Sequence, residues 1–329
     1  MNDKRTYYRL IALWVVCEAF LGGIIHGLKL PVSGLVVGSA AIICISLIGY
    51  FYNERMSILR ATIIVAIFKM MLSPQSPFMA YIAVLFQGLL GQLIFMNRKN
   101  FKTRCIIFSI IALIESGFQR LIIMTIVSGT DIWEVTDRFI GSLIGQSDAT
   151  GISYWIAGSY VLMHLIAGLM VGILAGRIPS LVLRNQKSAD MKIDIGDAEV
   201  IVNEKKSRRF KWLPRMLLCI TAVLVIHSSL YPQQALIPET IISKLILRTT
   251  LFILVWITLI NPILMLWLKQ WLERRKTNYV VDMKEITLLL PAMKLLVARC
   301  WRQSSSRKHI SRLNYFFKLV VLNSLNHDQ

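Results

Sequence analysis

Long apolar blocks separated by short polar stretches dominate this 329-residue chain. Most blocks approach the roughly 20 residues that a helix needs to cross a hydrocarbon core of about 30 Å. Because the blocks lack the repeated amphipathic period of soluble helices, they predict membrane spans. The predicted spans are residues 8–27, 31–50, 57–73, 77–96, 105–127, 152–176, 213–231 and 243–268.

Basic residues gather in alternate connections between these blocks. Lys4 and Arg5 precede the first span, residues 98–104 are strongly basic, and a long basic stretch follows the sixth span. The connection over 128–151 is mostly acidic instead. The positive-inside rule therefore predicts a multi-pass protein of the cell (inner) membrane with both termini in the cytoplasm.

Composition agrees with this topology, since 55% of the residues are hydrophobic and the mean hydropathy is +0.59. The net charge of +19 is explained by the cytoplasmic loops, so it does not indicate nucleic acid as a partner. The predicted fold class is all-α, with a six-span bundle, two further spans and two cytoplasmic amphipathic helices.

Four regions are predicted along the chain. Residues 1–185 form the six-span domain, and residues 186–212 form a cytoplasmic linker that is either a small hairpin at 191–202 or disordered. Residues 213–270 form a two-span segment, and residues 271–329 form the cytoplasmic amphipathic helices.

Polar residues at membrane depth are the main functional signal. An ionisable residue at mid-membrane costs at least a few kcal/mol, so it normally faces the interior of a bundle and a partner. Counting from the span ends places several such residues at similar depth. The candidate substrate-binding residues are Glu18, Lys69, Gln87, Glu115, Gln119, Arg120 and His164.

Two interpretations of these residues stay open. They line an outward-facing pocket for a small polar molecule, or they form a structural core in which Glu18 or Glu115 pairs with Lys69 or Arg120. A third and less favoured interpretation is a proton relay through His164.

The five cysteines lack metal-ligand spacing, and no HExxH, GxSxG or phosphate-binding glycine motif occurs. The sequence therefore predicts no metal, no cofactor and no enzyme, with a membrane enzyme as the least favoured alternative.

The acidic connection predicts an amphipathic helix on the outer surface. Asp131 is expected to cap it, with Glu134 completing a capping box. The helix is either a lid or an interfacial support. Small residues, Ala19 with Gly23 and Gly88 with Gly91, predict close helix approach elsewhere in the bundle.

The C-terminal region predicts helices over Lys284–Trp301 and Arg307–Leu325, separated by Ser304–Ser306, which is expected to cap the second helix. The apolar face of the second helix consists of Leu313, Phe316, Phe317 and Val320. Such a face, flanked by basic residues, lies on an anionic leaflet or docks in a partner's groove. We expect a protein partner.

Residues 1–185 resemble the substrate-binding S component of energy-coupling factor (ECF) transporters. The resemblance rests on six spans with both ends cytoplasmic, the outer loop Leu30-Pro31-Val32-Ser33-Gly34, and the stretches 59–74 and 87–91. It implies capture of a small polar or vitamin-like metabolite for ATPase-driven uptake. It also implies that Ala19 and Gly23 contact a transmembrane coupling subunit, with glycine where the family often has alanine.

The C-terminal part is similar in layout to the end of an ECF T subunit, whose coupling helices bind ATPase subunits. Ala298-Arg299-Cys300 stands where T subunits carry an Ala-Arg-Gly-like motif, so Arg299 joins the candidate partner-binding residues. No Walker A motif occurs, and any ATP hydrolysis must belong to another chain. The alternative is a non-transporting membrane scaffold whose polar core is structural and whose basic tail binds lipid or a partner.

Overall fold

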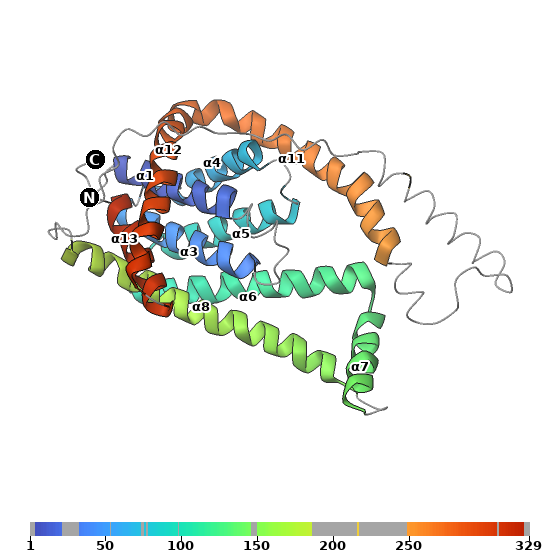
Figure 1. Cartoon of the computed structure of the whole chain (residues 1–329). Helices are drawn as coiled ribbons and strands as arrows, with labels where there is room; N and C mark the ends of the chain where they lie inside the picture. The colour runs from blue at the N-terminus through green and yellow to red at the C-terminus, as the bar shows by residue number, and fades with distance from the viewer. Residues whose placement is uncertain are drawn as a thin grey trace. The chain divides into compact units, whose positions relative to one another are not determined.

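The computed structural model describes residues 4–21, 33–52, 54–73, 76, 78–97, 99–145, 150–185, 216, 249–307 and 309–325 (Figure 1). Its elements are α1 (Lys4–Val16), η1 (Cys17–Leu21), α3 (Ser33–Phe51), α4 (Ser57–Leu72), α5 (Phe78–Phe95), α6 (Phe101–Ser128), α7 (Asp131–Ile144), α8 (Ile152–Asn185), η4 (Trp256–Ile260), α11 (Asn261–Lys276), η5 (Thr277–Tyr279), α12 (Val280–Gln303), η6 (Ser304–Ser306) and α13 (His309–Leu325). No strand occurs in this part of the chain, which confirms the all-α prediction.

Among the described residues, five helical stretches are long and apolar enough to cross a membrane, namely Gly34–Phe51, Phe78–Phe95, Phe101–Ser128, Ile152–Arg184 and Thr249–Ser306. They support a multi-pass membrane protein. The helix α8 continues past the predicted span end at residue 176, through Pro179, to Asn185. The predicted span 213–231, apart from residue 216, and the hairpin at 191–202 lie outside the described residues.

The chain divides into two compact units. The first comprises Met1–Ser116, His164–Val202 and Lys269–Gln329, and the second comprises Gly117–Met163 and Asn203–Leu268. Each unit therefore contains segments that are far apart in the sequence, and each is described separately below.

The helix α1 is the core of the first unit. It packs against α3, α4, α12 and α13, and its residues from Leu10 to Val16 are all buried. Its polar side chains make specific contacts as well: the Tyr7 hydroxyl donates to the Ser57 carbonyl at 2.8 Å, and the Tyr8 hydroxyl donates to Asp282 at 2.8 Å. The second bond fastens α1 to α12.

The short helix η6 follows α12, and α13 begins three residues after η6 ends. The ring of Trp301 meets Phe316 edge to face at 5.3 Å, and the Arg312 guanidinium lies 4.2 Å from the Trp301 ring centroid. Ser304 and Ser306 lie in η6, where their hydroxyls donate to the carbonyls of Trp301 at 2.7 Å and Gln303 at 3.2 Å. The expectation that these serines cap α13 stays a prediction, because residue 308, directly before that helix, lies outside the described residues.

The second unit contains the predicted outer helix, α7. Its N-cap is Thr130, and no side chain caps it, so the capping box predicted for Asp131 and Glu134 is wrong. Asp131 already lies within the first turn, and Glu134 pairs with Arg138 one turn later at 2.5 Å. The carboxylate that does cap a helix in this unit is Asp137, which accepts the backbone N–H groups of Gly151 at 2.9 Å and Ser153 at 2.6 Å.

Candidate functional site

A buried ion pair lies inside the first unit. The Lys69 ammonium on α4 donates to the Glu18 carboxylate at 2.6 Å, and both side chains are 3% exposed. Lys69 also donates to the Ala80 carbonyl of α5 at 3.3 Å. The sequence left four pairings open, each between one of two glutamates and one of two basic residues. The structure shows the pairing of Glu18 with Lys69.

The local backbone around Glu18 is unusual. Glu18 lies in η1, a single π-helical turn that follows α1 directly. Such turns are rare and occur often at functional sites. The carbonyl of the neighbouring Ala19 accepts the Ser73 hydroxyl at 2.9 Å, so α4 holds this turn at two adjacent positions.

Two buried polar groups of the first unit, one of them on a ring near the ion pair, make no hydrogen bond within the described residues. The Tyr81 ring lies 5.8 Å from the Lys69 ammonium, and its hydroxyl is buried without a partner. The indole N–H of Trp14, four residues before Glu18, is buried without one as well. Since buried polar groups are normally satisfied, these two have capacity for a further hydrogen-bonding molecule.

The other candidate substrate-binding residues lie on α5, α6 and α8. Gln87 is buried on α5, where a Cβ placed on Gly38 of α3 would lie 3.2 Å from its amide nitrogen. Glu115 on α6 is half-buried, and one of its carboxylate oxygens is buried without a hydrogen-bond partner. Gln119 and Arg120 belong to the second unit, with Arg120 exposed.

His164 is buried on α8, and its place follows from a row of glycines that the sequence interpretation missed. Gly168 and Gly172 pack against the α6 backbone, where a Cβ would lie 2.9 Å from the Ile110 Cα and 2.6 Å from the Ile106 Cα. Gly176 meets Lys102 of the same helix. His164 stands one turn before Gly168 and therefore shares the face of α8 that packs on α6. Glycines spaced by four in the predicted span were the signal that could have shown this face.

The candidate partner-binding residues differ in their surroundings. Ala19 and Val320 are buried, whereas Phe317 is 40% exposed and Arg299 is half-buried. Phe316 contacts Trp301 and Phe317. Gly23 and the side chain of Leu313 lie outside the described part of the chain. Docking of a partner at these residues remains a prediction.

Comparison with known proteins adds no family to this description. No protein-family model, no curated protein and no solved structure matches this chain. The site must therefore be interpreted from its own chemistry, which is that of a cation and an anion held together in an apolar interior, with the Tyr81 ring nearby and its hydroxyl without a partner among the described residues.

Proposed function

We propose that this chain is the substrate-capture component of an ATPase-driven uptake system of the ECF type, and that its substrate is a small polar or vitamin-like metabolite. In this proposal the chain crosses the membrane eight times with both termini in the cytoplasm. The catalytic ATPase subunits and a transmembrane coupling subunit are separate chains.

The observation that carries this proposal is the Tyr81 hydroxyl, which is buried without a hydrogen-bond partner among the described residues and belongs to a ring 5.8 Å from the Lys69 ammonium. Leaving a buried hydroxyl unsatisfied costs roughly 1–3 kcal/mol, a cost that a purely structural core avoids by using phenylalanine. A polar ligand would satisfy the hydroxyl. It could also replace half of the ion pair, since Lys69 binds a carboxylate and Glu18 binds an amine or a hydroxyl.

The scaffold alternative is favoured by a different observation. Glu18 and Lys69 satisfy each other directly at 2.6 Å and join η1 to α4, as a structural pair would. In a scaffold the polar core fixes helix register, and no ligand is needed.

Replacement of Tyr81 by phenylalanine separates the two functions because it removes only the hydroxyl. The protein is purified from its native membrane, and mass spectrometry identifies small molecules released on denaturation. In a capture component, wild type releases a polar molecule, and Tyr81→Phe retains at least several-fold less of it at unchanged or higher thermal stability.

The matched control is Tyr154→Phe, at an exposed tyrosine of the second unit that should leave the released molecule unchanged. If wild type releases nothing and Tyr81→Phe only raises stability, the scaffold function stands. If both variants lose the molecule equally, the binding site is not beside the ion pair.

Coupling to ATPase subunits has its own test in the exposed part of α13. Phe317→Ala should weaken recovery of candidate ATPase subunits in a pull-down, and this loss should persist at high salt because an apolar anchor carries the contact. Lys284→Gln, at an exposed basic residue of α12, is the control. If binding is lost at high salt and Phe317→Ala does not change it, the C-terminal helices bind the membrane surface instead of an ATPase subunit.

A further inference from the structure

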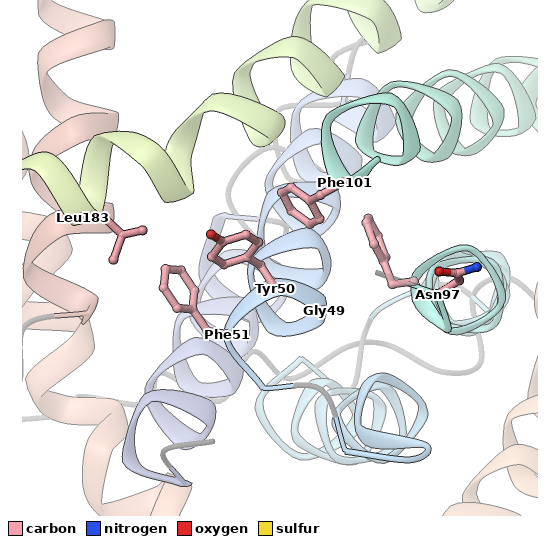
Figure 2. A pocket seen from close by; sticks show the side chains of 7 residues that line it. Gly49, Tyr50, Phe51, Asn97, Phe101 and Leu183 are labelled. Carbon is pink, nitrogen blue, oxygen red and sulfur yellow. The ribbon is translucent and has the colours of Figure 1, made fainter. Parts of the chain in front are cut away.

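A pocket of about 370 Å³ opens at the ends of four helices in the first unit. It is lined by Gly49, Tyr50, Phe51, Phe95, Asn97, Phe101 and Leu183. Figure 2 shows Tyr50 and Phe51 between Leu183 on one side and Phe101 and Asn97 on the other. The pocket is separate from the Glu18–Lys69 pair, whose residues do not line it.

The aromatic lining is a packed cluster rather than a set of loose side chains. The Tyr50 and Phe101 rings lie 4.9 Å apart, and the Phe95 and Phe101 rings lie 5.6 Å apart. Phe95 is almost completely buried, so it forms the floor, whereas Tyr50 and Leu183 are 39% and 52% exposed and can contact a bound molecule.

A basic side chain holds the connection that forms one wall of the pocket. Arg104, in the first turn of α6, donates to the carbonyl of Ile94 at the end of α5 and to the carbonyl of Lys99 at 2.7 Å. The amide oxygen of Asn97 accepts the backbone N–H of Lys99 at 3.1 Å. These hydrogen bonds link the end of α5 to the first turn of α6 on this side of the pocket.

Basic residues lie next to the lining residues along the chain. Lys102 directly follows Phe101, Arg184 directly follows Leu183, and Lys99 lies two residues after Asn97; all three side chains are exposed. On the positive-inside topology these helix ends lie at the cytoplasmic surface, where anionic lipids concentrate. Aromatic rings at the headgroup level and basic residues beside them are the two features that such lipids recognise.

We propose that this pocket binds one anionic phospholipid of the cytoplasmic leaflet. The aromatic rings hold the glycerol and the first methylenes of an acyl chain, and Lys102 and Arg184 bind the phosphate. The volume fits only part of a lipid, so the remainder of the acyl chains lies along the apolar helices. A soluble phosphate compound would use the basic residues but would leave the aromatic half of the pocket without an occupant.

Thermal unfolding of the delipidated full-length protein in detergent tests this inference. Phosphatidylglycerol should raise the unfolding temperature saturably, whereas phosphatidylcholine and soluble glycerol phosphate should not. Leu183→Trp fills the pocket at an exposed position and should abolish the shift. Lys102→Gln should weaken phosphatidylglycerol binding about five-fold, the change expected from one basic residue at an anionic surface.

Arg138→Gln is the control, because it removes one exposed positive charge from the second unit and should not change phosphatidylglycerol binding. Equal stabilisation by phosphatidylglycerol and phosphatidylcholine would overturn the inference. So would stabilisation by glycerol phosphate alone, or wild-type phosphatidylglycerol binding in both Leu183→Trp and Lys102→Gln. This experiment does not measure uptake. A negative result for lipid binding therefore does not contradict the proposed transport function.

Discussion

At the scale of single residues, the packing of α5 against α4 depends on Gly88. A Cβ added there would lie 2.0 Å from the Thr62 hydroxyl oxygen on α4. Gly91, on the same helix, would place a Cβ 2.5 Å from Ile45 on α3. The small pair predicted from the sequence therefore does permit close packing, and it does so against two different helices.

Gly88→Ala should destabilise the protein by about 1–3 kcal/mol, the usual cost of adding a methyl group to a filled interior. The control is Gly158→Ala in α8, where a Cβ would have no neighbour within 4 Å. That change should be neutral or slightly stabilising, because alanine favours the helix. Thermal unfolding in one detergent compares the two variants, and equal stability would show that α4 and α5 do not pack as described.

The Glu18–Lys69 pair makes a second prediction at this scale. Lys69→Met leaves a buried carboxylate without its cation and should cost about 3–5 kcal/mol. The double variant Glu18→Leu with Lys69→Met removes both charges and should recover most of that stability. A double-mutant cycle on unfolding free energies measures the coupling, and additive single effects would contradict the direct pairing.

At the scale of elements, α7 is fastened to α8 by one carboxylate. The backbone N–H groups of Ser153 and Gly151 hold the pKa of the Asp137 carboxyl below its usual range. In the same junction the Trp133 ring stacks on Tyr154 at 5.8 Å. The exposed residues Phe139 and Leu143 lie on α7 beyond these contacts, as an interfacial helix requires.

This junction should be sensitive to acid. Because the folded-state pKa of Asp137 is lowered, its stabilisation is complete above about pH 3.9, the ordinary aspartate value, and is lost as the pH falls through the folded pKa. Asp137→Asn should abolish this pH dependence and speed amide exchange at Gly151 and Ser153 at neutral pH. Asp131→Asn, at an exposed residue of the same helix, is the control and should change neither.

The sequence predicted helices better than it predicted their contacts, for a physical reason. The position of a membrane span follows from the local apolar composition, so α3, α5, α6 and α8 coincide with apolar blocks of the sequence. The partner of Glu18 depends on how α1 and α4 rotate about their axes, which no local pattern fixes. Asp137 was missed for the same reason, since its role as a cap arises only when α7 meets the start of α8.

At the scale of the whole molecule, the basic and acidic connections predict a single orientation. Lys99→Cys should react with a membrane-impermeant maleimide only after the cytoplasmic side is opened, and Asp131→Cys should react in intact cells. Both positions are exposed in the structure. Of the native cysteines that it describes, Cys44, Cys105 and Cys300 are buried and Cys17 is half-buried, so labelling of the unsubstituted protein is the background to subtract. Outside labelling at residue 99 would contradict the eight-span topology.

The hydrogen bond between Tyr8 and Asp282 joins residues that are 274 positions apart. At a translation rate of about 5–20 residues per second, roughly 14–55 s pass before the ribosome adds the second residue. During that interval α1 lacks the cover of α12. Completion of synthesis, rather than membrane insertion, is then the step that buries α1 fully, and a chain stalled before residue 280 should present it to quality-control proteases.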